Sequence, residues 1–160
     1  MQNTIETSMY QIGQLFLLPT LLLISLLFLY AFFVLGEFIT LALRRRSGGG
    51  QLLLLHFQKN PQTNDDELDM LAHRLIEGPR ITSRVTPMLG LVATMIPMGP
   101  ALKALPEGNL AGVSDNLVLA FSAVILSLLT ASITYYVVNV KRRWLSEELL
   151  QIAKLRKGDV

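Results

Sequence analysis

Uncharged, mostly apolar residues gather in three long segments of the chain. Residues 7–36, 85–102 and 116–140 carry no formal charge and are rich in Leu, Val, Ile and Phe. A helix needs about 17–25 mostly apolar residues to cross the hydrocarbon core of a bilayer. Three such segments in 160 residues leave too little polar surface to cover them in a soluble fold. The pattern predicts an all-α membrane protein with three transmembrane helices.

These segments define the expected organisation of a single membrane domain over residues 1–160. Transmembrane helices are expected at residues 11–43, 85–104 and 116–140. The remaining parts are a cytoplasmic loop with short helices at 44–84 and a cytoplasmic tail helix at 141–160, which continues the third span without a breaker. We expect the fold to be a membrane core with cytoplasmic helical extensions.

The predicted cytoplasmic loop contains several local signals. Residues 47–50 read Ser-Gly-Gly-Gly, which indicates a flexible break. The apolar stretch 51–58 is too short to cross a membrane, and we expect it to pack against the membrane face or a neighbouring subunit. Asn64 is expected to cap a short helix over 65–77, which the Gly-Pro pair at 78–79 would end.

The distribution of basic residues predicts the orientation. Every Lys and Arg falls within 44–84 or 141–160, except Lys103 beside the connector at 105–115. Short cytoplasmic segments of membrane proteins carry an excess of Lys and Arg. We therefore expect an inner-membrane protein with its N-terminus outside and its C-terminus in the cytoplasm. The basic surface is explained by topology and lipid headgroups, and no nucleic-acid partner is expected.

Residue types that carry enzyme chemistry are scarce. Cys is absent, and His56 and His73 show no metal-ligand spacing, so structural roles are expected for both. Glu37 is the one acid inside a predicted span, and it is either a functional group or a side chain that reaches the interface near Arg44. No intramembrane carboxylate pair, Ser/Lys dyad or phosphate loop is present. We expect no enzyme activity, no cofactor and no metal site.

Small and polar residues recur along one face of each of the last two spans. In the second span they are Pro87, Gly90, Thr94, Pro97 and Ala101. In the third they are Ala120, Ala123, Ser127, Thr130 and Thr134. Such stripes allow close packing of helices in lipid, and they can equally line a narrow pathway of hydroxyls. Pro97 also leaves the carbonyl of Ala93 without a backbone donor beside Thr94.

The stretch Thr86-Pro87-Met88-Leu89-Gly90-Leu91-Val92-Ala93-Thr94-Met95 resembles the signature of the MotA/TolQ/ExbB proton-channel family. Pro87, Gly90, Leu91 and Thr94 fall on fixed positions of that signature, and Ala93 replaces a usual Gly. The continuation over 96–102 is similar to a short-chain subgroup of the family. The similarity covers about residues 80–144, and the cytoplasmic loop is much shorter than in flagellar stator proteins.

The resemblance implies a pentamer whose second and third helices line a central pore. A separate one-span subunit resembling MotB, ExbD or TolR would carry the proton-accepting Asp. The pore Thr of the family falls on Thr94, with Pro87, Gly90 and Pro97 shaping the same face. In the third span the corresponding Thr falls on Ala120 or Val124, depending on the alignment, so helical periodicity favours a pathway along Ser127, Thr130 and Thr134 instead.

The function implied by this resemblance is a proton-channel subunit of an inner-membrane motor complex, which uses the proton gradient to drive work in a partner. Short members of the family further imply a link to a cobaltochelatase-like, tetrapyrrole-handling protein or to an uptake process. The alternative is a passive membrane scaffold subunit of a transporter or enzyme complex. In that case the small-residue faces serve packing only.

Overall fold

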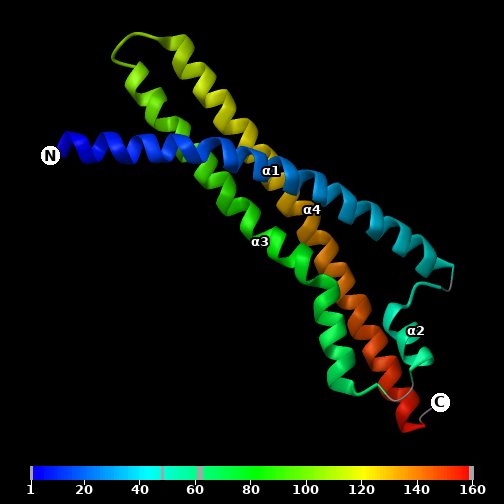
Figure 1. Cartoon of the computed structure of the whole chain (residues 1–160). Helices are drawn as coiled ribbons and strands as arrows, with labels where there is room; N and C mark the ends of the chain where they lie inside the picture. The colour runs from blue at the N-terminus through cyan, green and yellow to red at the C-terminus, as the bar shows by residue number, and fades with distance from the viewer. Residues whose placement is uncertain (1, 48, 61–62, 159–160) are drawn as a thin grey trace. The chain divides into compact units, whose positions relative to one another are not determined.

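Four helices make up most of the computed structural model, which describes residues 2–47, 49–60 and 63–158. In chain order they are α1 (Gln2–Arg46), α2 (Leu52–Lys59), α3 (Asp65–Ala104) and α4 (Leu110–Lys157) (Figure 1). By length and composition, α1, α3 and α4 are candidate membrane spans. The predictions of an all-α chain and of three spans are confirmed, and the chain is a multi-pass membrane protein.

The helices at either end of the chain are longer than the predicted spans. α1 begins at Gln2, whereas the prediction placed its start at residue 11. α4 begins at Leu110, six residues before the predicted start, because Gly108 reverses the chain at a positive φ of 70°. The side-chain oxygen of Asn109 then accepts a hydrogen bond of 3.0 Å from the Gly112 N–H and caps the new helix. The connector is therefore shorter than predicted.

The third span continues without a break beyond residue 140, as predicted, since α4 runs on to Lys157. Residues 159–160 of the predicted tail lie outside the described residues. The break predicted at 47–50 is also present, because neither α1 nor α2 includes these residues, although Gly48 itself lies outside the described residues.

The course of α3 corrects the prediction that Gly78 and Pro79 end a short helix. The helix starts as expected, with the side-chain oxygen of Asn64 accepting a hydrogen bond of 2.8 Å from the Asp65 N–H, and then continues to Ala104. A proline removes one backbone hydrogen bond but does not stop a helix whose turns are held by packing. Pro79 is itself buried, and Ala72 and Ile76 are buried in the turns before it.

The helices divide between two compact units, each with its own core. Unit 1 comprises Met1–Ala31 and Thr82–Ser132, and unit 2 comprises Phe32–Ile81 and Ile133–Val160. α1, α3 and α4 each contribute to both units, whereas α2 belongs to unit 2 alone.

Unit 1 is built on an antiparallel hairpin of α3 and α4, with the N-terminal part of α1 packed against it (Figure 1). Its core joins Ile24 of α1, Ala93 of α3 and Ala123 of α4, which are at most 2% exposed. The Lys103 ammonium lies 4.2 Å from the centre of the Tyr10 ring, which links the start of α1 to the end of α3. The small residues at 93 and 123 allow α1 to approach the hairpin closely.

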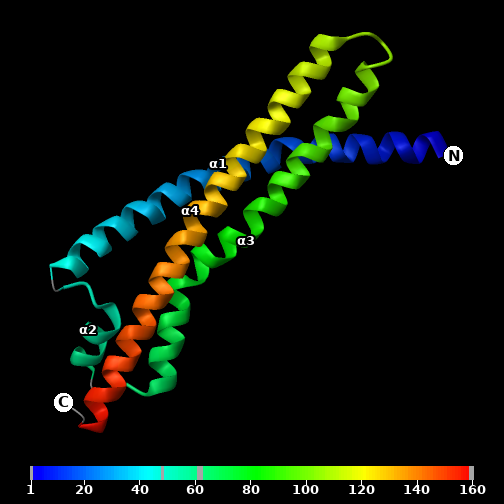
Figure 2. The ribbon, with the colours of Figure 1, turned by 180° about the vertical axis from the view of Figure 1, so that it is seen from behind.

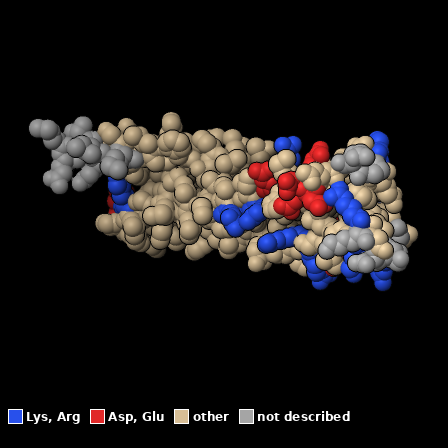
Figure 3. Space-filling model, turned by 90° about the horizontal axis from the view of Figure 1, so that it is seen from below, with Lys and Arg blue, Asp and Glu red and all other residues tan. Residues whose placement is uncertain are grey.

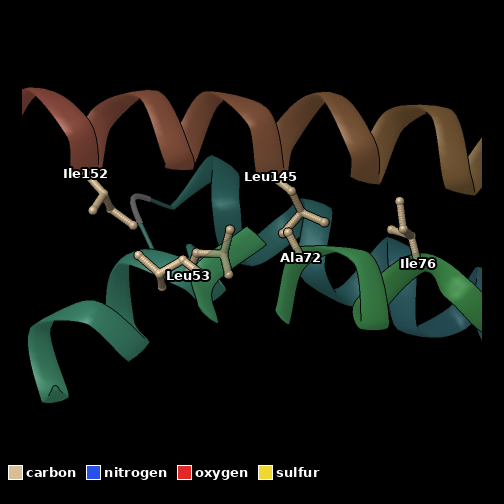
Figure 4. Close-up of a cluster of buried hydrophobic side chains, with 6 residues drawn as sticks. Leu53, Ala72, Ile76, Leu145 and Ile152 are labelled. Atoms are coloured by element: carbon tan, nitrogen blue, oxygen red, sulfur yellow. The ribbon is translucent and has the colours of Figure 1, made fainter. Parts of the chain in front are cut away.

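In unit 2, α2 lies beside the C-terminal part of α4 and the start of α3, as Figure 2 shows from behind. The buried core consists of Leu53, Leu68, Ala72, Ile76, Leu145 and Ile152, which come from three helices (Figure 4). Leu53 of the stretch 51–58 thus packs inside the chain, while Leu52 and Leu55 are 41% and 52% exposed, and the expected packing of this stretch against the membrane face or a neighbouring subunit stays a prediction. Leu53 has no exposed surface because α3 and α4 of the same chain cover it.

Apolar side chains remain on the outside of unit 1. Leu15, Leu91 and Met95 are 74%, 66% and 73% exposed. Hydrocarbon tails are the natural contact for such a surface on a membrane span. On the face seen in Figure 3, most of the Lys, Arg, Asp and Glu side chains gather in one region, a smaller group lies apart from it, and a broad area carries none. Every Lys and Arg of the chain belongs to unit 2 except Arg84 and Lys103.

Candidate functional site

The buried face of α3 in unit 1 differs in part from the predicted stripe. It consists of Thr82, Thr86, Gly90, Ala93, Pro97 and Ala101. Gly90 and Pro97 lie on this face as expected, whereas Pro87 and Thr94 are only partly buried and lie at its edge. Thr82 and Thr86 were missed as members of the face. The spacing of four residues from Thr82 to Thr86 and from Thr86 to Gly90 is the signal that could have found them.

Gly90 marks the closest approach of α3 to α4. A Cβ atom at this position would lie 2.1 Å from Oγ and 2.9 Å from Cβ of Ser127. Both distances are well inside van der Waals contact, so only glycine fits between the helices here. The two predicted small-residue stripes therefore meet within one chain at Gly90 and Ser127.

A group of buried hydroxyls surrounds this contact. Ser127 and Thr130 are 1% and 0% exposed, and they donate hydrogen bonds of 2.8 Å to the carbonyls of Val124 and Leu126 in their own helix. Thr86 has no exposed surface and donates to the Thr82 carbonyl at 2.7 Å. The antiparallel register that sets Gly90 against Ser127 places Thr86 at the level of Thr130. We call Thr86, Ser127 and Thr130 the hydroxyl cluster.

Thr94 lies apart from the hydroxyl cluster, at the edge of the hairpin. Its side chain is partly exposed and donates a hydrogen bond of 2.7 Å to the Leu91 carbonyl. Its neighbours Leu91 and Met95 point outward. Pro97 is buried and cannot donate to the Ala93 carbonyl, which leaves a backbone acceptor one position before Thr94. Thr94 thus presents a hydroxyl near the outer surface of a single chain.

Thr134, the last hydroxyl of the predicted pathway, belongs to unit 2 and has no exposed surface. In the same unit Glu37, the one acid inside a predicted span, forms an ion pair with Lys141 at 2.7 Å between Oε1 and Nζ. The side chain of Lys141 is 9% exposed and that of Glu37 is 52% exposed. Glu37 is therefore already matched to a cation within the chain.

Glu148 is a polar side chain of unit 2 that sequence reasoning missed. It is 2% exposed, and its two carboxylate oxygens accept hydrogen bonds from Nη1 of Arg45 at 2.7 Å and from the backbone N–H of Leu53 at 2.8 Å. Gln51 caps α2 without a side-chain hydrogen bond, so Glu148 supplies the missing acceptor. The sequence did offer a signal for this burial. Glu148 is an acid three residues after Leu145, on the apolar helix face that continues to Ile152.

The hydroxyl cluster and Thr94 offer two chemically similar but separate sets of groups. A hydroxyl can both donate and accept a hydrogen bond, so either set can relay a proton, although neither can hold a charge as a carboxylate does. Among the residues that the structure describes, no group of three or more His, Cys, Asp or Glu side chains is placed to hold a metal ion.

Enlarging Gly90 should weaken the hairpin of α3 and α4. We expect Gly90→Ala to lower the free energy of unfolding by about 1–3 kcal/mol, because the new methyl group overlaps Ser127. Gly99→Ala in the same helix is the matched control, since its nearest neighbour is a Tyr10 ring carbon at 3.6 Å. Unfolding in mixed detergent micelles, followed by circular dichroism, measures both.

A second substitution, in α4, checks whether overlap with Ser127 causes the loss of stability. Ser127→Gly removes both atoms that meet the new methyl group, so it should restore stability when combined with Gly90→Ala. If Gly90→Ala is as stable as Gly99→Ala, the close contact at Ser127 does not exist in the folded protein.

Comparison with protein-family models, with curated proteins and with solved structures finds no match to this chain.

Proposed function

We propose that the chain is a proton-channel subunit of an inner-membrane complex that uses the proton gradient to drive work in a partner. The observation that carries the proposal is the placement of Thr94. This residue occupies the pore-threonine position of the resembled MotA/TolQ/ExbB signature, and its hydroxyl lies near the outer surface of the single chain. Assembly of several chains can therefore turn Thr94 toward a central pathway without breaking the hairpin.

The proton-accepting acid of this complex is proposed to come from another subunit. Residues 85–104 and 116–140 contain no Asp or Glu, and Glu37 is paired with Lys141. A one-span subunit like MotB, ExbD or TolR, with an Asp in its membrane segment, would supply the missing group. The Thr94 hydroxyl, which can both donate and accept a hydrogen bond, would then pass protons to and from that Asp.

The proposed assembly is a pentamer with its N-termini outside and its C-termini in the cytoplasm. The orientation is supported by the position of the basic residues, which favour the cytoplasmic side. Since Gly90 and Ser127 are covered within one chain, contacts between chains are assigned to the exposed apolar side chains around Leu91 and Met95, which would face a neighbouring chain instead of lipid. The driven process is proposed to be chelatase-linked or uptake-linked.

A second candidate function is a passive membrane scaffold for a transporter or enzyme complex. The observation that favours it is the mutual burial of the two stripes, because Gly90, Ser127 and Thr130 already have a packing role inside the hairpin. Under this alternative the Thr94 hydroxyl serves only its own helix through the Leu91 carbonyl.

Native mass spectrometry of the chain purified in mild detergent tests the assembly. We expect a closed oligomer of five copies, and we expect a one-span membrane protein to be retained when the complex is isolated from its own host. The physical reason is that a pore needs a closed ring, whereas the scaffold function does not. A spectrum that contains only monomer would count against the channel.

A further inference from the structure

Two contacts fix how the start of α3 and the end of α4 lie alongside each other in unit 2. An ion pair joins Asp65 of α3 to Arg156 of α4. Leu145 of α4 lies beside Ala72 of α3 in the buried core (Figure 4). The two segments are antiparallel, so each step forward along α3 corresponds to one step back along α4. Residue numbers at one level therefore add up to a nearly constant value, which is 221 at the ion pair and 217 at the core contact.

An exposed face of α3 carries charged and apolar side chains in a fixed order. In chain order they are Asp66, Met70, Arg74 and Glu77. With 3.6 residues per turn, they fall within about 80° of one another around the helix. Met70 is 59% exposed, and among the described residues the three charged side chains have no ion-pair partner. We call this the α3 face, and its order is acid, apolar, base, acid.

An exposed face of α4 consists of Arg143, Glu147, Leu150 and Lys154, which fall within about 60° around the helix. Leu150 is 60% exposed, and Lys154 has no ion-pair partner in the described parts of the chain. Arg143 and Glu147 lie 3.7 Å apart and are still 73% and 53% exposed, and Glu147 also lies 3.4 Å from Arg45. Exposed pairs of this length contribute little, so both groups are available to another chain. We call this the α4 face.

The α3 face and the α4 face are complementary at four matching levels. The residue numbers add up to 220 or 221, within the range found inside one chain, for Asp66 with Lys154, Met70 with Leu150, Arg74 with Glu147, and Glu77 with Arg143. Three of these pairs join opposite charges, and the other joins two apolar side chains. Such complementarity fixes the register of an interface and disfavours wrong partners.

The two faces cannot meet within one chain. Met70 lies about 160° around α3 from Ala72, and Leu150 lies about 140° around α4 from Leu145. Ala72 and Leu145 belong to the core that joins the two helices, so each face points away from the other helix of its own chain. A group that covers either face must come from outside the chain.

A ring of identical chains would bring the two faces together at the correct height. α4 includes the third candidate span and continues as one helix to Lys157. Rotation about an axis across the membrane carries one chain onto the next without changing the depth of any residue. Residues that meet between neighbours therefore have equal depth, which agrees with the matching levels of the α3 face and the α4 face.

We infer that the α3 face of one copy docks on the α4 face of the next copy, in a head-to-tail contact. Both faces lie outside the predicted spans 85–104 and 116–140, so this contact adds to the one assigned to Leu91 and Met95. It rests on the proposed assembly of several chains, and it does not depend on proton transfer.

Disulfide cross-linking of the full chain tests the contact, because the native sequence has no Cys. Met70→Cys and Leu150→Cys are made as separate chains with different tags, assembled together in mild detergent and oxidised. We expect a cross-linked dimer with one chain of each kind, and almost none from either variant alone, since a head-to-tail contact never sets position 70 against position 70. Leu155→Cys in place of Leu150→Cys is the matched control, because Leu155 is 49% exposed but lies about 140° around α4 from Leu150.

Reversal of one charge tests the register of the contact. Lys154→Glu in every chain sets an acid against Asp66 of the next copy, and it should lower the yield of the cross-link between positions 70 and 150 about fivefold. Adding Asp66→Lys restores opposite charges and should restore the yield. Lys59→Glu is the matched control, because Lys59 is an exposed lysine outside both faces.

Native mass spectra of the wild-type chain separate failure of this contact from failure of the proposed assembly. Oligomers that form without the cross-link between positions 70 and 150 would overturn the contact and leave the assembly in place, whereas monomer alone would overturn both. Equal yields with Leu150→Cys and Leu155→Cys would also overturn it, since that result indicates random collision. A yield that Asp66→Lys fails to restore would refute the pairing of Asp66 with Lys154.

Discussion

Replacing Thr94 by Val is expected to abolish proton transfer through the assembled complex while leaving the assembly intact. The two side chains have nearly the same shape, but Val can neither donate nor accept a hydrogen bond. Because Thr94 is only partly buried and its hydroxyl bonds to its own helix at Leu91, the fold should tolerate the change. Proton uptake by vesicles that contain the complex, read with a pH-sensitive dye, measures the effect.

Thr94→Ser provides the matched control for this prediction. Serine keeps the hydroxyl and loses one methyl group, so the channel function predicts that most proton transfer survives. The scaffold function predicts the reverse order, since Val packs as well as Thr and Ser leaves a small void. Full proton transfer in the Val variant would show that Thr94 is not part of the ion pathway.

The largest expected effect on stability belongs to Glu148→Ala. The substitution leaves the Arg45 guanidinium and the Leu53 N–H without their acceptor, in a region where the Arg45 side chain is only 17% exposed. Removing one partner of a buried ion pair costs about 3–5 kcal/mol. We expect α2 to lose its attachment to α4, which hydrogen exchange of the amides at 52–59 would detect as a loss of protection.

Glu147→Ala is the control for Glu148→Ala. The side chain of Glu147 is 53% exposed and makes longer contacts, 3.4 Å to Arg45 and 3.7 Å to Arg143. Exposed pairs of this kind contribute about 0–1 kcal/mol. If both substitutions change exchange at α2 by the same amount, Glu148 does not hold this helix in place.

The spans and the continuation of the third span as one long helix could be predicted from the sequence, because long uncharged runs and helical spacing of Leu145, Leu149 and Ile152 are local signals. The prediction that a helix ends at Gly78 and Pro79 was wrong, because it relied on a local signal alone. Proline weakens a helix locally, and the burial of Pro79 together with packing of Ala72 and Ile76 against other elements compensates for that weakness. Such contacts come from residues far away in the chain.

The candidate site, too, could be predicted only as far as local sequence signals reach. The small-residue stripes could be found by their spacing, but periodicity alone does not reveal which edge of a stripe meets a neighbour. The structure turns Gly90 toward Ser127 and leaves Thr94 at the edge. The anchoring of α2 by Glu148 spans 95 positions of sequence, so it has no local signature.

Proton flux through the wild-type complex is the most direct test of the proposed function. Vesicles are prepared with the chain alone, with its one-span partner alone, and with both, and an acid pulse is followed with an internal pH-sensitive dye. The channel function predicts flux that requires both proteins and that is lost when the membrane Asp of the partner is replaced by Asn. A stable complex of the two proteins that carries no flux in any state would contradict it.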